Sequence, residues 1–453
     1  MTSNQNKPLV TPARRRAFDI LRRVETEGAY ASVLLAANPR ESDLSREDRA
    51  LAQELVLGVL RWQLSLDNLI ERYSQRQISR LDSAVVIALR LGLYQLRYLT
   101  RIPQSAAVNE SVNLVKHARV ASAGGFVNAV LRRAAKNPQE FPSAIIEDPA
   151  EQAAVEMSHP RWMLDRWRAE LGDDETRELA LANNTASPTA FRVNTLRTTI
   201  AAAIQSLEAG GVTARESDVA GGAFVVEKGP AHSVLQAAEE GLIYIQDQAS
   251  QLVSQLLNPT GGQRILDLCA APGSKTSHIA ALTDDKAWIV ACDRRPQRLQ
   301  SLQTACARLG IGSVDTVALD ATQPLPWVES ATRFDRVLVD APCSGTGTLR
   351  SNPEIKWRLS VADIQNLAVV QLRLLERGAA AVAEGGRLVY STCSIEREEN
   401  EAVLENFMEE NQQFELSNPK INPKFVTSDG FVRTFPHRHG TDGFFAAVLE
   451  RVR

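Results

Sequence analysis

The chain has 453 residues, enough for two to four domains, and its 44% apolar and 23% charged residues are ordinary for a soluble globular protein. No apolar run is long enough to cross a membrane, and the N-terminus, MTSNQNKPLVTPARRR, lacks the apolar core of a secretory signal. We therefore expect a cytoplasmic protein without membrane segments.

The net charge of −3 is distributed unevenly along the chain. Residues 1–140 contain 21 Lys and Arg against 13 Asp and Glu, a balance of +8, so the remainder carries −11. A basic module on an acidic body indicates a polyanionic partner, such as nucleic acid. A solvated helical surface rich in arginine would give the same balance, and charge alone leaves both interpretations open.

The five cysteines all lie in the second half of the chain, and none forms a C-x-x-C pair. They are Cys269, Cys292, Cys306, Cys343 and Cys393. This spacing argues against a zinc site or a disulfide framework and favours a reducing compartment. We expect no bound metal.

Residues 12–140 are predicted to be entirely helical, because apolar residues recur there at three- and four-residue spacing. The predicted helices are Arg14–Glu27, Arg46–Ser65, Asp67–Ser74, Ser83–Leu99, Ala107–Ala118 and Gly125–Ala135. Alternating strand patterns are lacking, so we predict an all-α bundle over residues 1–145. Three prolines within residues 137–157 indicate a linker.

Residues 155–248 differ in pattern and are predicted to form a small α+β accessory domain. The predicted elements are helices at Trp162–Leu171, Asp174–Ala182 and Ile200–Ala209, and strands at Thr189–Asn194, Phe224–Val226 and Leu242–Gln246.

Residues 249–453 alternate between strand and helix patterns. The predicted strands are Arg264–Leu268, Trp288–Cys292, Ser313–Ala318, Arg336–Val339, Gly386–Ser391 and Gly443–Leu449. Helices intervene, most clearly at Pro296–Leu309 and Val361–Ala383. This alternation predicts an α/β domain with a doubly wound, Rossmann-like sheet.

The stretch Gln263–His278, QRILDLCAAPGSKTSH, combines an apolar strand, a loop of small residues and a helix N-terminus. Small residues let the backbone approach a ligand, and the free N–H groups of a helix start attract negative charge, so a nucleotide site is expected. The loop is neither a dinucleotide fingerprint nor a phosphate loop, since Ser274 precedes Lys275 and no glycine lies five residues earlier. A tight turn without a ligand is the alternative.

Four acids follow successive predicted strands: Asp267, Asp293, Asp320 and Asp340. Ligands of doubly wound sheets lie at the carboxyl ends of the strands. Asp293 fits the acid that binds ribose hydroxyls, and Asp320 is placed to meet an adenine amino group. A helix N-cap is the alternative for any one acid, but four in succession favour a site.

Two cysteines also follow predicted strands directly, and both are expected to open onto the same crevice. Cys343 lies in VDAPCSG and Cys393 in VYSTCS. A lone cysteine is more often a small buried apolar residue. Two at strand ends, one beside a proline and an acid, favour a nucleophile. Cys292 and Cys306 fall inside a predicted strand and helix, and with Cys269 they keep the structural interpretation.

Several motifs around these positions match one pattern: LDLCAAPGSKT, DAPCSGTG and STCS. They resemble the RNA 5-methylcytosine methyltransferases of the Nop/Sun type, in which the first loop usually reads CAAPGGK, so Ser274 departs from the family. GVLRWQLSLDNLI, ALRLGLYQLRYL, VNESVNLVK and GFVNAVLRR resemble the NusB-like RNA-binding domain. FRVNTL, GLIYIQDQASQL and DGFFAAVLE resemble the accessory domain and last strand of the family. The resemblance covers nearly the whole chain.

The resemblance implies cytosine-C5 methylation of small-subunit ribosomal RNA, with Cys393 as the nucleophile. Cys343 would release the covalent RNA adduct, and Asp340 would stabilise the protonated base. The methyl donor would be S-adenosylmethionine, bound by Asp293, Asp320, Asp340 and one loop. The loop residues are Cys269, Ala270, Ala271, Pro272, Gly273, Ser274 and Lys275. The expected partner is naked or early-assembly ribosomal RNA, bound by a monomer.

Three alternatives stay open from the sequence. One is an RNA-binding chaperone or transcription factor with an inert α/β domain, which the two cysteines and the strand-end acids disfavour. Another is a nucleotide hydrolase, which the missing phosphate loop disfavours. Within the methyltransferases, transfer RNA is the second candidate substrate.

Overall fold

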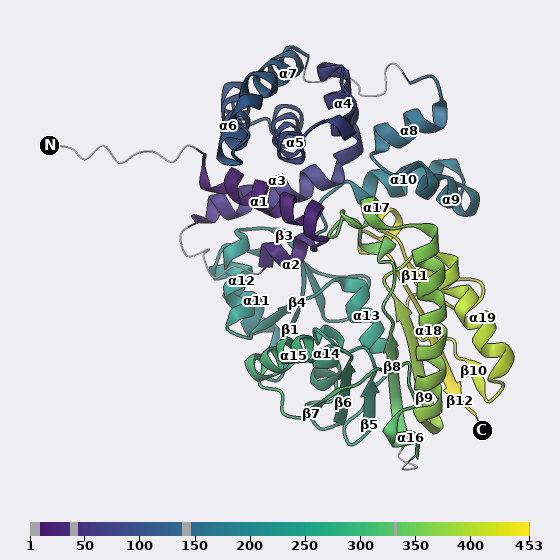
Figure 1. Cartoon of the computed structure of the whole chain (residues 1–453). Coiled ribbons are helices and arrows are strands. Elements are labelled where there is room, and N and C mark those ends of the chain that lie inside the picture. The colour runs from purple at the N-terminus through teal and green to yellow at the C-terminus, as the bar shows by residue number, and fades with distance from the viewer. Residues whose placement is uncertain (1–9, 37–43, 138–145, 330–332, 453) are drawn as a thin grey trace. The chain divides into compact units, whose positions relative to one another are not determined.

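The computed structural model describes residues 10–36, 44–137, 146–329 and 333–452 (Figure 1). Its contacts divide the chain into two compact units. The first, here the helical unit, comprises residues 1–186 together with Leu349–Arg358. The second comprises Ser187–Thr348 and Leu359–Arg453 and is here called the catalytic unit, because all the candidate site residues of the sequence analysis lie in it. Within the described ranges, no helix combines the length and the apolar content needed to cross a membrane.

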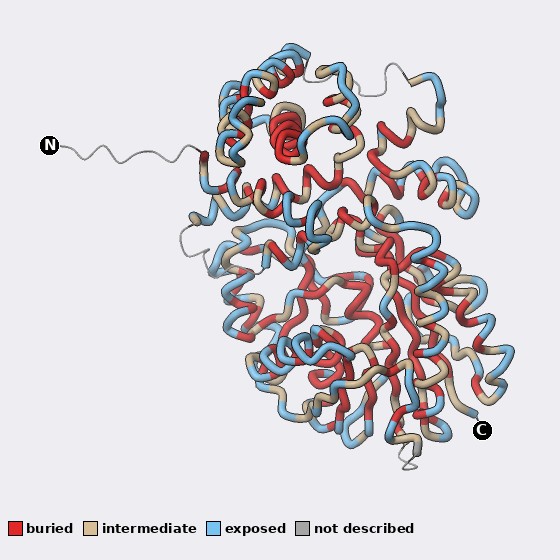
Figure 2. Tube along the Cα trace, in the orientation of Figure 1, coloured by how far each residue is buried: buried red, intermediate tan, exposed pale blue. Residues whose placement is uncertain are grey.

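The first part of the helical unit is a bundle whose helices share one apolar core. Its helices are α1 (Pro12–Glu27), α2 (Ala31–Ala36), α3 (Arg46–Arg61), α4 (Gln63–Ser74), α5 (Ser83–Tyr98), α6 (Gln104–His117) and α7 (Gly124–Lys136). The helix α5 is buried on every side from Ala84 to Gln95 and forms the centre of the bundle (Figure 2). Helices apolar all round belong inside a core, so α5 organises the other six.

Two predictions for this unit were wrong, and one short helix was missed. The break predicted after Ser65 lies at Trp62, where α3 ends and α4 begins. The predicted linker contains α8 (Pro149–Met157), because Asp148 caps the helix and Pro149 fills its first position. The short α2 was not predicted. Part of the predicted linker, residues 138–145, lies outside the described residues. Two further helices follow, α9 (Arg161–Leu171) and α10 (Asp173–Asn183), close to their predicted bounds.

The catalytic unit begins with a small antiparallel sheet of order β2-β3-β1-β4. Its strands are β1 (Ala190–Val193), β2 (Thr213–Glu216), β3 (Ala223–Lys228) and β4 (Ile243–Ile245). The helices α11 (Ile200–Ala209) and α12 (Ala231–Glu239) share one core with this sheet. The predicted α+β class is thus confirmed, although β2 and α12 were not predicted. The boundaries proposed for the three domains, 1–145, 155–248 and 249–453, stay predictions.

The large sheet has the order β10-β12-β9-β8-β5-β6-β7, and β11 pairs with β12. Its strands are β5 (Arg264–Asp267), β6 (Trp288–Asp293), β7 (Val314–Ala318), β8 (Phe334–Asp340), β9 (Val382–Thr392), β10 (Phe414–Leu416), β11 (Val432–Thr434) and β12 (Phe444–Arg451). The five strands from β9 to β7 pair in parallel, whereas β12 pairs antiparallel with β9. The predicted doubly wound α/β sheet is confirmed; the three-residue strands β10 and β11 were not predicted.

Both faces of this sheet are buried, which explains its apolar strands. On one face, Leu266 and Val337 pack with α18 (Val361–Ala381) and α19 (Glu401–Glu410). On the other, Ile265 and Leu338 pack with α13 (Gln248–Leu256) and α14 (Ser274–Leu282). Chain order runs from β5 to β6 and β7 on one side and to β8 and β9 on the other, so the direction reverses beside β5. Ligands of such sheets bind at this reversal.

Candidate active site

The carboxyl ends of β5, β8 and β9 lie side by side. The register pairs Asp340, the last residue of β8, with Ser391 near the end of β9. Ser391 Oγ donates to Asp340 Oδ1 over 2.8 Å. Because parallel strands end at one edge of the sheet, the loops that follow them carry Cys343 and Cys393 to the same place.

The two cysteines meet at this edge, with their Sγ atoms 3.3 Å apart. Both side chains are half-buried and neither is in a disulfide. The sulfur contact with Cys393, followed by burial, raises the pKa of Cys343 well above its ordinary value. At this distance one of the two thiols donates to the other.

Lys275, the second residue of α14, forms an ion pair with Asp340 at 2.7 Å between Nζ and Oδ2. Its ammonium also lies over the Phe444 ring. Burial lowers the pKa of Lys275, but attraction and hydrogen bonding from Asp340 outweigh it, so the pKa is raised and the ammonium stays charged. Electrostatic attraction to Cys393 also raises the pKa of Lys275, so the cation and the cysteine lie close enough to interact. The sequence grouped Lys275 with the cofactor loop; the structure connects it to Asp340 and Cys393.

The loop from Cys269 to Lys275 turns sharply at Gly273, where φ is 104°. A Cβ at Gly273 would lie 2.7 Å from Leu302 Cγ, so only glycine fits. Ser274, where the family has glycine, already belongs to α14 and has no positive φ. Its side chain therefore places no strain on the loop.

Asp267 ends β5 and lies beneath this loop, 1% exposed. Thr276 Oγ1 donates to its Oδ2 over 2.7 Å, whereas Oδ1 is buried without a hydrogen-bond partner among the described residues. Burial raises the pKa of Asp267 to about 7. A buried acceptor without a donor is costly and indicates a place for a ligand with N–H or O–H groups.

Asp293 ends β6 and is 7% exposed. It accepts from the backbone N–H of Arg295 over 2.8 Å and pairs with Arg298 at 3.4 Å. The same Arg298 donates to Ala271 O over 2.7 Å, so it holds the end of β6 against the loop after β5. The sequence did not single out Arg298, since an arginine in the first turn of a helix resembles many others.

Asp320 lies two residues beyond β7 and is half-exposed. Its Oδ1 accepts from the N–H of Thr322 over 3.0 Å and from Thr322 Oγ1 over 2.7 Å, and these bonds lower its pKa. This is the turn-capping arrangement that was the alternative interpretation of each acid. One oxygen, Oδ2, is left for other donors.

A buried network that the sequence did not reveal fixes the two cysteine loops. Glu399, 0% exposed, accepts from the Ser344 N–H over 2.8 Å, from Ser344 Oγ, and from Gln371 Nε2 over 2.9 Å. Gln371 also donates to Pro342 O over 2.9 Å. Burial raises the pKa of Glu399. In the sequence, Glu399 is one of several polar residues that follow STCS. Such a run is too common to predict a role for any one of them.

The remaining cysteines are not part of this sulfur contact. Cys292 and Cys306 are buried in β6 and α15 (Pro296–Leu309), and burial raises the pKa of each thiol. Cys269 follows β5, and burial raises its pKa as well. Among the residues that the structure describes, no cluster of three or more His, Cys, Asp or Glu side chains is arranged to hold a metal ion.

Comparison with known proteins matches three parts of the chain to family models. Residues 254–450 match the 16S rRNA methyltransferase RsmB/F model, residues 11–136 the NusB family, and residues 159–232 the ferredoxin-like domain of RsmF/B-like methyltransferases. The matched regions cover the large sheet, the bundle, and a stretch that runs from α9 through β3 of the small antiparallel sheet.

Whole-chain relatives agree with these matches. A probable ribosomal RNA small subunit methyltransferase B from Synechocystis is 38% identical over 97% of this chain and 99% of its own. A protein of the same description from Bacillus subtilis is 34% identical with the same coverage. The crystal structure of PH0851 superimposes with a TM-score of 0.82 at 28% identity, covering 98% of this chain and 100% of its own. The chain therefore belongs to the RsmB/F family of ribosomal RNA small-subunit methyltransferases, which use S-adenosylmethionine as the methyl donor.

Proposed function

We propose that this protein transfers a methyl group from S-adenosylmethionine to carbon 5 of a cytosine in 16S ribosomal RNA, through a covalent adduct at carbon 6. The observation that carries this proposal is the pair of cysteine sulfurs 3.3 Å apart, beside Asp340 and Lys275. One thiol accounts for the attack on carbon 6 of the base, and the second accounts for the elimination that releases the methylated base.

Cytosine needs this covalent route because its carbon 5 is a poor nucleophile. When a thiolate adds to carbon 6, the 5,6 double bond opens and carbon 5 becomes enamine-like. It can then attack an electrophilic methyl group, after which loss of the carbon-5 proton and of the thiolate restores the ring.

Cys393 is the better candidate for the nucleophile. The Lys275 ammonium interacts with it, and a nearby cation favours a thiolate. We propose that Cys343 donates to the same sulfur, which stabilises its thiolate. In this assignment both contacts act on the Cys393 sulfur.

We propose that Asp340 hydrogen-bonds the N3 and N4 edge of the base. Its side chain is 27% exposed, so a base entering the crevice can reach it. Ser391 and Lys275 each occupy one of its two oxygens and fix their orientation. A carboxylate held in this way stabilises a ring that is protonated at N3, the form in which carbon 6 most readily accepts a thiolate.

Cys343 is proposed to act in the second half of the reaction. Once Cys393 has entered the adduct, Cys343 loses its sulfur partner and lies beside the modified ring. As the carbon–sulfur bond breaks, a base must take the carbon-5 proton. We propose that Cys343 first gives its own proton to solvent and then takes the carbon-5 proton as a thiolate. The bonding electrons of carbon–sulfur return to Cys393, which is regenerated.

S-adenosylmethionine supplies the electrophilic methyl group. The loop Cys269–Lys275 and Asp293 are proposed to hold it, with Asp293 on the ribose hydroxyls and Asp320 beside the adenine. The buried, unpartnered Oδ1 of Asp267 and the close packing at Gly273 fit a ligand cradled at this strand end.

The base must be unpaired or flipped out of a helix to enter this crevice. We propose that the basic helical bundle holds the flanking RNA, mainly through phosphates. We further propose that naked or early-assembly RNA is the substrate, that the protein acts as a monomer, and that it works in the cytoplasm. Transfer RNA stays the second candidate; bisulfite sequencing of total RNA from a deletion strain distinguishes the two.

The two cysteines provide the decisive experiment. In the Cys343→Ala variant, Cys393 should still attack carbon 6. A protein–RNA adduct that survives denaturing electrophoresis should therefore accumulate. Cys393→Ala should lose turnover and form no adduct, with Cys306→Ala as the matched control. Near-native activity in both variants would show two structural thiols and refute the proposal. An adduct with Cys393→Ala alone would exchange the two roles.

A further inference from the structure

Glu399 and Asn400 are consecutive residues of the catalytic unit, between the short helical turn Arg397–Glu399 and α19. Both side chains are 0% exposed. Polar side chains in such surroundings are satisfied by hydrogen bonds within the protein. The bonds of these two residues run to the two loops that carry Cys343 and Cys393.

The Glu399 carboxylate holds the residue that follows Cys343. Its Oε1 accepts from the Ser344 N–H over 2.8 Å, and its Oε2 accepts from the Ser344 hydroxyl. Hydrogen bonds to a carboxylate are stronger than those between neutral groups, and burial keeps water from replacing them. Ser344 therefore cannot move without breaking two bonds to a buried acceptor.

Gln371, on α18, holds the residue that precedes Cys343. Its Nε2 donates to Pro342 O and to Glu399 Oε1, over 2.9 Å each. A carbonyl oxygen only accepts, so the amide nitrogen of Gln371 faces Pro342. Cys343 is thus held on both sides by two side chains that are bonded to each other.

Asn400 holds the residues on both sides of Cys393. Its Oδ1 accepts from Thr392 Oγ1 over 2.6 Å, and its Nδ2 donates to Ser394 O over 2.9 Å. Thr392 and Ser394 are buried, so water does not compete for these bonds. One side chain therefore fixes the turn on which Cys393 lies.

Hydroxyl groups connect the two sets of bonds. Ser344 Oγ lies 3.1 Å from Ser394 Oγ, and Ser394 Oγ lies 3.2 Å from Thr346 Oγ1. Ser344 and Ser394 are the residues directly after the two cysteines. The Tyr390 hydroxyl donates to Glu399 O over 2.5 Å and fixes the backbone of the same network. The separation of the two sulfurs is thus set by bonds within the catalytic unit.

We propose that these two consecutive residues position the two cysteines for two different steps of the reaction. Glu399, together with Gln371, positions Cys343 for the release of the methylated base. Asn400 positions Cys393 for the attack on carbon 6. The inference rests on the proposed function, which supplies the two steps. The buried side chains act through the residues that flank each cysteine and touch neither substrate nor cofactor.

Gln371→Leu tests the positioning of Cys343, because it removes the bond to Pro342 O with a side chain that suits a helix. It should lower kcat by roughly 10- to 100-fold, the typical cost of a small misplacement of catalytic groups. The share of enzyme trapped as RNA adduct during turnover should rise toward that of Cys343→Ala. Affinity for S-adenosylmethionine should stay near the wild-type value.

Two changes at Glu399 separate hydrogen bonding from charge. Glu399→Gln keeps an oxygen for the Ser344 N–H and for Gln371, and its new amide group can donate to Ser344 Oγ. It should therefore keep most of the turnover. Glu399→Leu removes all of these bonds and should accumulate adduct as Gln371→Leu does.

Asn400→Leu tests the positioning of Cys393. The rate of adduct formation is measured in the Cys343→Ala background, where the product of the attack accumulates. Asn400→Leu should slow this rate by roughly 10- to 100-fold, whereas Gln371→Leu should leave it nearly unchanged. Thr392→Val removes the hydroxyl that donates to Asn400 but keeps the shape of the side chain, so a smaller decrease is expected. It decides the test if Asn400→Leu does not fold.

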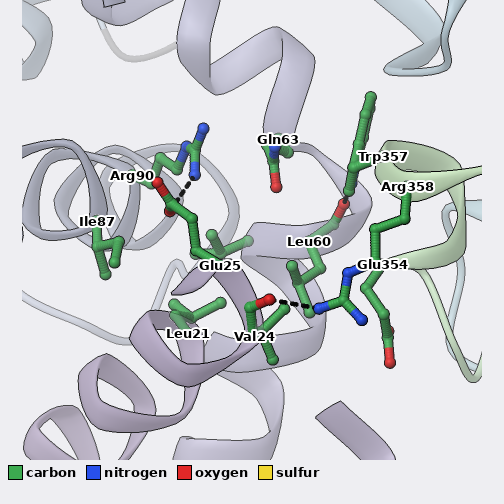
Figure 3. Close-up of a pocket in the computed structure, with 11 residues that line it drawn as sticks. Leu21, Val24, Glu25, Leu60, Gln63, Ile87, Arg90, Glu354, Trp357 and Arg358 are labelled. Carbon is green, nitrogen blue, oxygen red and sulfur yellow. Dashed lines mark hydrogen bonds and ion pairs between the residues drawn. The ribbon is translucent and has the colours of Figure 1, made fainter. Parts of the chain in front are cut away.

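Glu354→Leu is the control for the loss of a buried carboxylate. Glu354 is 1% exposed and lies on the wall of a cavity of about 220 Å³ in the helical unit (Figure 3). Its Oε1 accepts from the Ala31 N–H over 2.8 Å, within the same unit. This variant should leave both the share of trapped enzyme and the rate of adduct formation near the wild-type values.

Melting curves and binding of S-adenosylmethionine show which variants are folded. A folded Gln371→Leu with unchanged kcat and no added adduct would overturn the proposal for Glu399. An unchanged rate of adduct formation in Thr392→Val, or in folded Asn400→Leu, would overturn it for Asn400. If Cys343→Ala itself forms no adduct, the proposed function fails, and this is seen before any of these variants is interpreted.

Discussion

Cys343 Sγ and Cys393 Sγ lie 3.3 Å apart although 50 residues separate them in the chain. The contact arises because β8 and β9 are parallel neighbours, and Asp340 and Ser391 lie opposite each other at their ends. Each loop then needs only three or two residues to bring its cysteine to the same point. At this distance one thiol donates to the other, so a change at either sulfur alters the surroundings of its partner. The chemistry of either cysteine therefore depends on the other.

Lys275 should control the reactivity of Cys393. Lys275→Met removes the ammonium that interacts with this sulfur, so alkylation of Cys393 in the free protein should become slower. Turnover should fall by roughly 100-fold or more, because Asp340 also loses its partner. Labelling rates followed by mass spectrometry measure the first effect, and single-turnover methyl transfer measures the second.

Lys275→Arg keeps the charge and serves as the control for this substitution. It should restore part of the alkylation rate. A melting curve for each variant shows whether the uncompensated carboxylate of Asp340 has destabilised the fold. Equal alkylation rates in the wild type and Lys275→Met would remove Lys275 from the nucleophile's environment.

The strands of the catalytic unit could be predicted because their physical cause is local. A parallel strand covered on both faces must be apolar throughout, and Ile265 and Leu266 pack against opposite layers. Residues that follow such strands are at the ligand-binding edge, so the sequence was sufficient to assign Cys343 and Cys393 to that edge. The strands β10 and β11 have three residues each, too few to show a pattern.

Other features depend on contacts that leave no pattern in the sequence. The break at Trp62 has no side-chain cap and no proline or glycine, so the helical periodicity runs through it. The sequence around Lys356 does not predict that this side chain is buried, because its three hydrogen-bond partners come from three helices that are distant in the chain. Glu399 and Gln371 act on the Cys343 loop from separate elements. Hydrogen bonds between distant polar residues require particular positions in the folded structure but no particular spacing along the chain.

Asp293 should contribute to binding of S-adenosylmethionine in the absence of RNA. Asp293→Ala removes a carboxylate that is proposed to accept from ribose hydroxyls, and should weaken binding by roughly 1.5–3 kcal/mol. Isothermal calorimetry measures this loss directly, with the exposed Asp429→Ala as the control. Unchanged affinity would place Asp293 outside the cofactor site and leave it as the partner of Arg298.

The basic surface of the helical bundle should give RNA binding its dependence on salt. Truncation is a poor test, because removing the bundle would leave Lys356 and Arg358 without their carbonyl partners. Three exposed cations on α6 and α7 can be replaced instead: Lys116, Arg132 and Lys136. If each contacts a phosphate of a single strand, their combined change to alanine should reduce the slope of log K against log salt by about 2.

Fluorescence anisotropy with a labelled RNA fragment over a range of salt concentrations measures that slope. Lys286→Met changes an exposed cation in the catalytic unit and should leave the slope nearly unaltered. A triple variant with the wild-type slope would mean that this part of the basic surface is only solvated.

Asp267 should make the stability of the ligand-free catalytic unit depend on pH. Burial raises the pKa of Asp267 to about 7, whereas the unfolded chain has an ordinary carboxyl near pH 4. Between these values the folded state binds the extra proton, so the free energy of unfolding falls as pH rises, by up to about 1.4 kcal/mol per pH unit. The stabilisation is complete below the pKa of the unfolded chain and is lost as the pH passes the pKa of the folded state.

Asp267→Asn keeps the acceptor for Thr276 but cannot titrate, so it should lose this slope. Denaturant unfolding from pH 5 to 8, with Asp429→Asn as the control, measures the difference between the curves. Parallel curves for Asp267→Asn and the wild type would show that the carboxyl ionises in the fold as readily as in the unfolded chain.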